Sequence, residues 1–469
     1  MVFSSLTFLC IFLPAVFGLY LLVPGIRAKN VLLVVFSFLF YAYGEPVYVL
    51  LMLASTLCNY LFGLWIEWRG GRFRKAALLT AVLFNLGLLG VFKYTDMVIG
   101  SVNALLQTEF ALTGIELPIG ISFYTFQALS YVIDVYRGEV KAQKNYLHIA
   151  LYISLFPQLI AGPIVKYHDV EAQITDRHPS RGTVAAGLRR FIAGLSKKVL
   201  IANTMAVAAD ALYVLPADQL NTLSAWTAAG AYMLQIYFDF SGYSDMAIGL
   251  GHMFGFTFPE NFNYPYSARS MQDFWRRWHI SLTTWFREYL YIPLGGNRRG
   301  RLRTSINRLV VFFCTGLWHG PAWTFVIWGL YNGGFLLLEG AVPRLQKLPR
   351  LTGHAYTLLA VLTGFIFFRA ETLSQGASMI AQLFTAGNWS VRAVGYVFEQ
   401  LSPTFITALV AGIILSAPVL RIVGAWAGRR PQRARALTAA SYPLSILLLL
   451  VCMMTLSSGT YNPFIYFRF

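Results

Sequence analysis

The sequence predicts an all-α, polytopic integral membrane protein. Of its 469 residues, 57% are hydrophobic and only 12% are charged, whereas a soluble domain carries about 25% charged residues. Apolar runs follow one another along the whole chain, with short basic loops between them, and the mean hydropathy is +0.57. We expect about 11–13 spans, because several runs fall short of the ~20 residues that a spanning helix needs. Residues 1–469 are expected to form a single membrane domain.

The net charge of +17 comes from 37 basic and 20 acidic residues. The arginines lie in short loops beside apolar runs, which is the arrangement that the positive-inside bias of membrane proteins produces. Their expected counter-charges are anionic membrane lipids, so no nucleic-acid partner is predicted.

Four apolar runs open the chain, at residues 6–23, 31–43, 47–66 and 76–92. No positive charge precedes the first run and no cleavage site follows it, so it is predicted to be a membrane helix and not a signal peptide. Basic residues follow the first run (Arg27, Lys29) and the third run (residues 69–75). Both groups fall in the cytoplasm if the N-terminus faces outside, which is the predicted orientation.

Three further segments are unusual for lipid-facing helices. Residues 117–135 are rich in Ser, Thr, Tyr and Gln, which predicts a helix that faces the protein interior. Residues 146–165 contain Pro157 and an Ala-Gly-Pro triplet at residues 161–163, which predicts a broken helix. Residues 184–207 carry basic side chains on one face, and the sequence leaves open whether they lie in the interface or cross the membrane.

Residues 225–258 place Asp239 and Asp245 inside an apolar run. Carboxyl groups in such surroundings must be paired, hydrated or protonated. The favoured interpretation is a structural anchor with Arg276 or Arg277 as the partner, and the alternative is a direct role in the chemistry.

The central stretch, residues 272–328, holds His279 and His319 on either side of a basic loop at residues 297–308 that contains no acid. An ionisable residue in an apolar run is costly and predicts a functional site. Further apolar runs cover residues 325–338, 355–368, 405–422 and 445–456.

A metal site is not expected at these histidines. Neither has a histidine or carboxylate three or four residues later, and no HExxH motif is present. The four cysteines are isolated, and no G-x-S-x-G motif indicates a serine hydrolase. Because burial keeps imidazole neutral, the preferred hypothesis is a general base that accepts a proton from an attacking hydroxyl.

Two other classes of function stay open at this point. In a transporter or export component, the polar spans would form a pathway and the histidines would relay protons. In a non-catalytic scaffold for periplasmic partners, the histidines would be structural.

Several motifs resemble those of the membrane-bound O-acyltransferase (MBOAT) superfamily. The resemblance rests on FWRRWHISL at residues 274–282, WFREYLY at residues 285–291 and GLWHG at residues 316–320, and further matches occur at residues 156–163, 237–245, 367–371 and 462–466. Within the superfamily, residues 1–5, 118–124 and 294–297 resemble the bacterial membrane subunits that take part in O-acetylation of alginate and other exopolysaccharides.

The resemblance implies a ring of helices around a central tunnel, in the bacterial inner membrane. It further implies an O-acetyltransferase that takes acetyl groups from a cytoplasmic thioester, acetyl-CoA, without a bound cofactor. Periplasmic acetyltransferase subunits are the implied partners, and alginate, or alternatively cellulose or another exopolysaccharide, is the implied acceptor. His319 is then the catalytic base and His279 its helper. The candidate substrate-binding residues are Trp278, Trp318, Arg276, Arg277 and Asp245.

Overall fold

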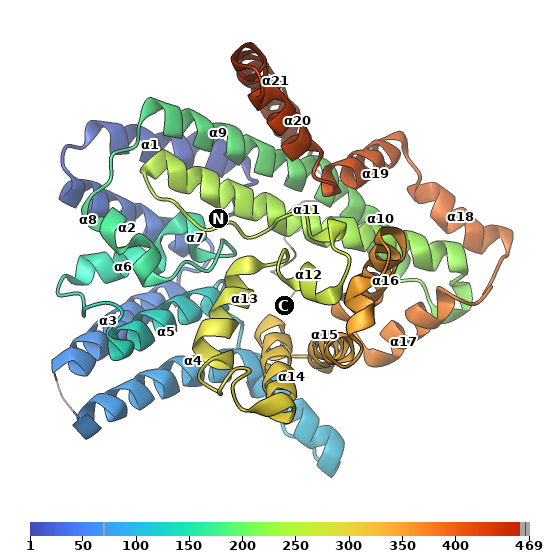
Figure 1. Cartoon of the computed structure of the whole chain (residues 1–469), viewed down its shortest axis with the longest axis horizontal. Coiled ribbons are helices and arrows are strands. Elements are labelled where there is room, and N and C mark those ends of the chain that lie inside the picture. The colour runs from blue at the N-terminus through green and yellow to red at the C-terminus, as the bar shows by residue number, and fades with distance from the viewer. Residues whose placement is uncertain (69–70, 460–464, 466–469) are drawn as a thin grey trace. The chain divides into compact units, whose positions relative to one another are not determined.

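The computed structural model describes residues 1–68, 71–459 and 465, and regular secondary structure in this part of the chain is helical (Figure 1). The one β-feature among these residues is an isolated bridge between Asn221 and Gly387. The prediction of an all-α fold is therefore confirmed. The described chain divides into two compact units, Met1–Phe191 with Ser244–Pro259 and Ile192–Tyr243 with Glu260–Phe469. A single membrane domain for residues 1–469 stays a prediction.

The first unit contains the N-terminal helices and the last part of α11. These helices are the π-helical turn η1 (Phe8–Phe12), α1 (Leu13–Leu22), α2 (Ile26–Ala42), α3 (Tyr48–Trp68), α4 (Gly71–Leu106), α5 (Ile121–Arg137), α6 (Tyr146–Ser154), α7 (Phe156–Leu159), α8 (Tyr167–Thr175) and most of α9 (Arg181–Ser196).

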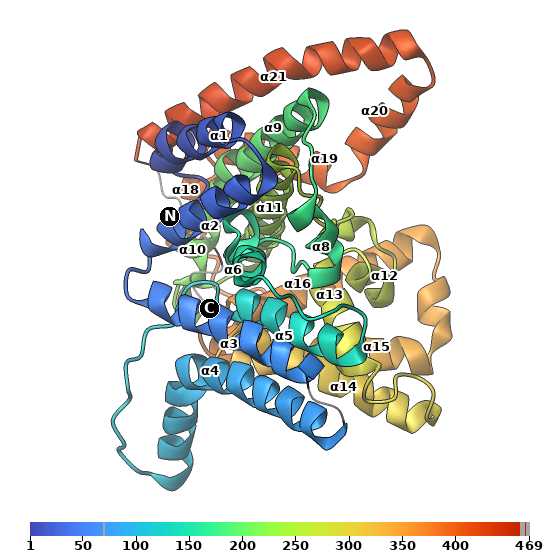
Figure 2. The ribbon, with the colours of Figure 1, turned by 90° about the vertical axis from the view of Figure 1, so that its left-hand side faces the viewer.

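Helices α3, α4 and α5 pack against one another in the first unit (Figure 2). Polar side chains of α5 are buried, among them Gln127, Ser130 and Asp134, each at 0% exposure. Two of them bond inside the protein: the hydroxyl of Ser130 lies 3.0 Å from that of Tyr152, and a carboxylate oxygen of Asp134 lies 3.0 Å from Nδ1 of His168. The prediction that this segment faces the protein interior is confirmed.

The segment predicted to be broken is broken. Helix α6 ends at Ser154, Leu155 leaves the helical region with ψ of 112°, and the four-residue α7 begins with Pro157 in its first turn. Gly162 follows against α7, where a Cβ would lie 2.6 Å from the Cα of Gln158. Only glycine permits this approach, so the Ala-Gly-Pro triplet is held in a non-helical conformation.

The second unit holds the central stretch that the sequence singled out. It contains η2 (Lys197–Ala202), α10 (Asn203–Tyr213), η3 (Ala217–Gln219), most of α11 (Thr222–Phe254), η4 (Pro265–Ser267), α12 (Met271–Trp275), α13 (Ile280–Phe286), η5 (Arg287–Tyr291), α14 (Gly300–His319), α15 (Trp323–Ala341), η6 (Pro343–Lys347), α16 (Arg350–Arg369), α17 (Leu373–Gln382), α18 (Val391–Gln400), α19 (Pro403–Ser416), α20 (Val419–Gly428) and α21 (Pro431–Ser457).

Helices α14 and α15 lie side by side and approach closely at two glycines. A Cβ on Gly316 would lie 2.4 Å from the carbonyl oxygen of Phe325, and one on Gly329 would lie 2.3 Å from that of Phe312. Any side chain would push the two backbones apart. This contact fixes the C-terminal end of α14, where His319 lies.

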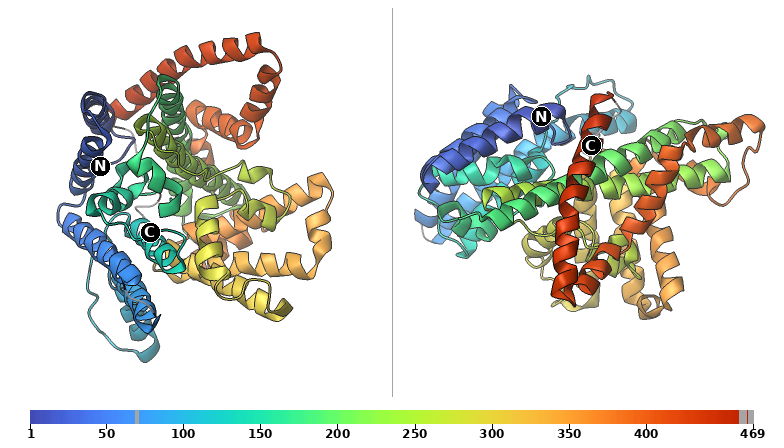
Figure 3. Two further views of the ribbon diagram at one scale, coloured as in Figure 1. Left: turned by 60° about the vertical axis from the view of Figure 1, so that its left-hand side comes forward. Right: turned by 90° about the horizontal axis from the view of Figure 1, so that it is seen from above.

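Helices α20 and α21 are joined by a sharp turn and contact each other beside it (Figure 3). Only 6% of the most apolar window of α21 is buried. Because an exposed apolar helix of 27 residues is long enough to cross a bilayer, its surface suits a lipid environment.

Among the described residues, five helices are long and apolar enough to cross a membrane. They are Tyr48–Trp68, Gly71–Leu106, Arg181–Tyr213, Arg350–Arg369 and Pro431–Ser457. A bent pair, α18 with α19, would add a sixth if it formed one span. The segment at residues 184–207 thus belongs to a helical run long enough to cross. The expected 11–13 spans and their arrangement around a tunnel stay predictions.

Candidate active site

The short helix α12 directs the chain towards His279. Ser270 caps α12, its hydroxyl accepting a hydrogen bond from the amide of Asp273 at 3.1 Å. The buried carboxylate of Glu339 accepts from the amides of Met271 (2.6 Å) and Gln272 (3.0 Å), which places negative charge at the helix N-terminus. After α12 the chain turns, and His279 adopts a left-handed conformation with φ of 44° directly before α13. Such strain in a non-glycine residue occurs preferentially at functional sites.

Asn261 fixes the orientation of the His279 ring. The Oδ1 atom of Asn261 accepts from the amide and the hydroxyl of Ser281, at 3.2 and 2.8 Å, so it is the oxygen of this side chain. The Nδ1 atom of His279 lies 3.1 Å from the same oxygen and must therefore donate a proton to it. In a neutral imidazole the other nitrogen, Nε2, then carries a lone pair. It has no hydrogen-bond partner among the described residues.

Burial keeps the His279 imidazole neutral. The residue is 1% exposed, and it lies outside the helices that meet the length and hydropathy of a membrane span. Desolvation lowers the pKa of His279 to about 3, because the charged imidazolium loses its hydration. At physiological pH, Nε2 of His279 is thus a hydrogen-bond acceptor.

His319, the last residue of α14, lies close to His279. The centroids of the two imidazole rings are 6.5 Å apart. His319 is 6% exposed and packs edge-on against the rings of Trp328 and Phe368, each at 5.0 Å between centroids. The structure therefore brings together two histidines that are 40 positions apart in the sequence (319 − 279).

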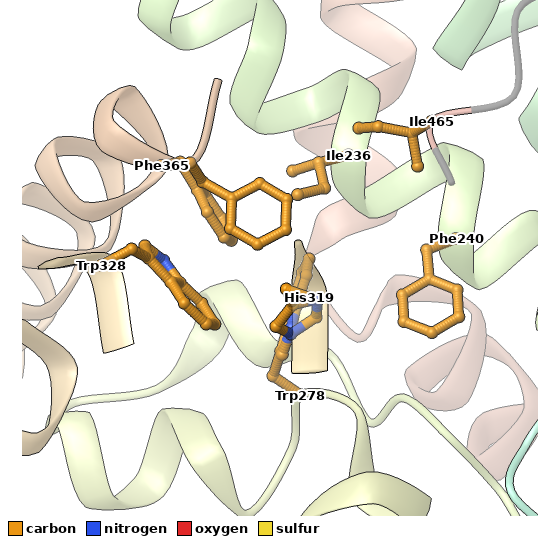
Figure 4. Close-up of a pocket in the computed structure, with 8 residues that line it drawn as sticks. Ile236, Phe240, Trp278, His319, Trp328, Phe365 and Ile465 are labelled. Atoms are coloured by element: carbon orange, nitrogen blue, oxygen red, sulfur yellow. The ribbon is translucent and has the colours of Figure 1, made fainter. Parts of the chain in front are cut away.

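A small cavity adjoins His319. It measures about 10 Å³, which is close to the space that one water molecule requires. Figure 4 shows His319 among the side chains that line it, with Trp328 and Phe240 on either side. The walls are aromatic or aliphatic, so the imidazole is the one ionisable group among the residues that line this space.

The cavity wall is completed by a residue from the far end of the described chain. Ile465 lines the cavity, and its amide donates to Oδ2 of Asp239 at 2.9 Å. The other oxygen of Asp239 lies 2.9 Å from Nζ of Lys198, in a pair whose side chains are 3% and 1% exposed. This buried pair therefore holds Ile465 beside α11, one residue away from the cavity-lining Phe240.

The predicted partners of the two aspartates on α11 are wrong. Asp239 pairs with Lys198 and not with Arg276 or Arg277. Asp245 pairs with Arg190, 2.9 Å away within the first unit. The interpretation as structural anchors is otherwise supported, because both carboxylates have a cationic partner on the preceding helical run. Spacing along the chain does not reveal which faces of two helices meet.

The remaining candidate residues occupy different positions. Trp278 lines the cavity, and the ring of Trp318 lies 5.0 Å from His319 and 5.9 Å from His279. Arg276 is exposed. Arg277 donates to the carboxylate of Asp273 at 2.8 Å. The two tryptophans therefore lie at the histidines, and the two arginines do not contact them.

Sequence reasoning missed three contributors to the site: Asn261, Lys198 and Ile465. Asn261 lies in a loop whose composition is typical of a turn, so the sequence does not indicate that its side chain accepts a hydrogen bond from His279. Lys198 did carry a signal, since a lysine inside an apolar run requires a buried acid.

The geometry suits proton transfer in a dry environment. Two buried imidazoles lie side by side, and one of them is held in a defined tautomer. Among the described residues, one group of three side chains has the spacing of metal ligands, Asp134 with Glu139 and His168, and it lies in the first unit. Neither His279 nor His319 belongs to it.

The model of the membrane-bound O-acyltransferase family matches residues 138–370, which contain both histidines. The chain is 41% identical over its whole length to a probable alginate O-acetylase of Pseudomonas putida, of which it covers 100%. The chain belongs to the membrane-bound O-acyltransferase family. It is therefore an O-acyltransferase and a multi-pass membrane protein, as the motifs predicted.

Two further relatives broaden the comparison. A peptidoglycan O-acetyltransferase of Helicobacter pylori is 36% identical over 81% of this chain and 79% of its own length. A teichoic acid D-alanyltransferase of Bacillus subtilis is 28% identical over 53% of this chain and 66% of its own length. The names of these relatives describe the transfer of an acetyl or a D-alanyl group, and the molecules they name are alginate, peptidoglycan and teichoic acid.

Proposed function

We propose that this membrane O-acyltransferase transfers acetyl groups from the cytoplasmic thioester acetyl-CoA for O-acetylation of an exported polysaccharide, alginate. It acts in the bacterial inner membrane, and periplasmic acetyltransferase subunits complete the transfer to the polymer. His319 is the general base and His279 assists it. The observation that carries the proposal is the pair of buried, adjacent imidazoles, one of which lines an apolar cavity.

The proposed chemistry needs no bound cofactor. Nitrogen of His319 accepts the proton of an acceptor hydroxyl while the hydroxyl oxygen forms a bond to the thioester carbonyl carbon. The carbon–sulfur bond then breaks, and the proton passes from His319 to the departing thiolate. General-base assistance of this kind accelerates a reaction by about 10²–10⁴-fold. The neutral Nε2 of His279 is suited to orient the hydroxyl, because it accepts a hydrogen bond.

The alginate acceptor and the acetyl donor are supported by the relatives' names and by a cavity wall in which His319 is the one ionisable group. A small, uncharged acyl group fits such a wall, whereas a charged aminoacyl group such as D-alanyl would lose its hydration there.

The test is polymer acetylation in cells that carry His319→Ala, with the amount of the variant in the membrane measured in parallel. We expect acetyl content to fall to background at normal protein abundance. His178→Ala is the matched control, because His178 is a histidine with a 91% exposed side chain. Isolated membranes supplied with acetyl-labelled CoA test the donor directly.

Three outcomes would contradict the proposal. Retained acetylation in His319→Ala would show that the imidazole is not the base. Transport of a substrate without consumption of acetyl-CoA would favour an export component. Label that appears on peptidoglycan, while alginate stays unlabelled, would change the acceptor to that named for the Helicobacter relative.

A further inference from the structure

The second unit contains another, much larger cavity. It measures about 980 Å³ and is bordered by α11, α16, α19 and the segment from η4 to Arg277. Tyr266 lines this lateral cavity and Trp278 lines the cavity at His319, and their rings lie 6.2 Å apart. The two cavities are therefore neighbours that share a wall of aromatic side chains.

One part of the lateral cavity is cationic. Arg269 and Arg350 line it, and no carboxylate is among the lining residues. In the described part of the chain, the guanidinium groups of Arg269 and Arg350 have no hydrogen bond or ion pair. The Nδ1 atom of His354 lies 3.1 Å from the carbonyl oxygen of Ala268, to which it donates, so the ring is fixed beside Arg269.

The same lining carries an unused buried hydroxyl. Ser416, at the C-terminal end of α19, is only 8% exposed, and its Oγ atom has no hydrogen-bond partner among the described residues. A buried polar group without a partner is destabilising because it has lost its hydration, so a hydrogen-bonding ligand in this cavity would stabilise the hydroxyl.

The rest of the lining is aliphatic. Leu358 of α16 and Leu409 of α19 lie in it, and Ile413 is 59% exposed. Helix α16 meets the criteria for a membrane span and begins at Arg350. Leu358 lies two turns deeper, about 12 Å along the helix axis. Polar groups thus occupy one end of the lining on both α16 and α19, and apolar groups occupy the other end.

We propose that the lateral cavity binds an anionic phospholipid. Its phosphate lies against Arg269 and Arg350 with Ser416 as a hydrogen-bond donor, and an acyl chain follows Leu358, Leu409 and Ile413. Basic pockets between membrane helices bind lipid headgroups in this way. The positive-inside bias assigns the lipid to the cytoplasmic leaflet, because the arginines lie at the end of a span. The inference depends on neither the donor nor the acceptor proposed above.

Other anions match this cavity less well. Free phosphate would pair with the arginines but would leave the aliphatic walls in contact with water. Coenzyme A carries phosphates and an adenine, yet Tyr266 is the one aromatic side chain in the lining, and its hydroxyl already donates to the carbonyl oxygen of Met233 at 2.5 Å. A phospholipid matches both ends of the cavity, because its phosphate pairs with the arginines and its acyl chain covers the aliphatic wall.

The test is native mass spectrometry of the full-length protein in detergent, combined with titration of defined ligands. The probes are phosphatidylglycerol, phosphatidylcholine, inorganic phosphate and coenzyme A. We expect the wild type to retain phosphatidylglycerol at least about tenfold more tightly than phosphatidylcholine, since the loss of one charge-assisted contact is worth about a factor of ten.

Two variants test the lipid site in different ways, one by removing its charge and the other by filling its volume. The double variant Arg269→Gln/Arg350→Gln removes its charge, and both residues are exposed, so folding should be unaffected. Gly230→Leu fills the cavity, because Gly230 lines it and a Cβ there meets nothing within 4 Å. Both variants should lose phosphatidylglycerol about tenfold or more. Arg344→Gln, an exposed arginine of η6 outside the lining, is the matched control and should behave as the wild type.

Every other outcome overturns the proposal. Equal retention of phosphatidylcholine would show that charge does not select the ligand. Displacement of phosphatidylglycerol by coenzyme A would reassign the cavity to the nucleotide, and equal binding of inorganic phosphate would reduce it to an anion site. Wild-type retention in both variants would place the lipid elsewhere on the protein. None of these results bears on acetylation by His319.

Discussion

Each unit of this protein holds a histidine beside polar partners, half-exposed His168 in the first unit and buried His279 in the second, and the two partnerships differ. In the first unit, His168 lies between two carboxylates, with Nδ1 3.0 Å from Asp134 and Nε2 3.3 Å from Asp169. In the second unit, His279 contacts the neutral amide oxygen of Asn261 and is otherwise surrounded by aromatic rings. Both nitrogens of His168 are occupied, whereas Nε2 of His279 keeps its lone pair. The partner therefore decides whether an imidazole is available for chemistry.

The largest contrast is expected between alanine variants of these two histidines. His279→Ala should lower acetylation by about 10²–10⁴-fold, because a group that orients or accepts the proton is lost. His168→Ala should leave activity per folded protein within about threefold and should lower thermal stability, because the carboxylate of Asp134 is 0% exposed. Acetylation and melting temperature of the purified variants give both values. If His279→Ala and His168→Ala lost acetylation activity to the same extent, the proposed difference in function between the two histidines would be wrong.

A second contrast concerns how each unit neutralises a buried aspartate. Asp239 forms a buried ion pair with Lys198, while Asp134 lies 3.0 Å from Nδ1 of His168. Lys198→Met should destabilise the protein by about 3–5 kcal/mol, because it leaves a buried charge without its partner. Lys198→Met with Asp239→Asn should recover part of this loss, and denaturant or thermal unfolding in detergent measures it. A double variant less stable than the single one would contradict the pairing.

The smallest effect should come from giving His279 the kind of partner that His168 has. Burial lowers the pKa of His279 to about 3, so the wild type should show no loss of activity from this group between about pH 5 and 8. Asn261→Asp places a carboxylate at Nδ1, which raises the pKa of His279 and favours the imidazolium. Activity of the variant should then fall as pH falls from about 8 to 6, by about tenfold. Asn261→Gln is the uncharged control, and an equal pH profile in both variants would exclude this mechanism.

Much of the fold was accessible from the sequence because it depends on local composition. The density of apolar residues predicted helices, and the Ala-Gly-Pro triplet predicted the break after α6. The histidine pair was also found, since an ionisable group in an apolar run is conspicuous. Their function in catalysis stays a prediction until His319 and His279 are substituted.

What the sequence could not provide was the choice of partner. Arg190, Lys198, Arg276 and Arg277 are all chemically suitable for the aspartates of α11, and only the rotation of packed helices selects the first two. Asn261 was missed for the same reason: its role arises from a turn that brings residue 261 to residue 279.

The hydrogen bond between the amide of Ile465 and Asp239 has a consequence for the order in which the new chain folds. The cavity wall combines residues of α11, α14, α15 and α16 with a residue that follows α21. We therefore expect the wall beside His319 to stay incomplete in a nascent chain until Ile465, which follows α21, has reached Asp239. We expect the newly made enzyme to mature in two stages, first the insertion of its helices and then the completion of this cavity wall by Ile465.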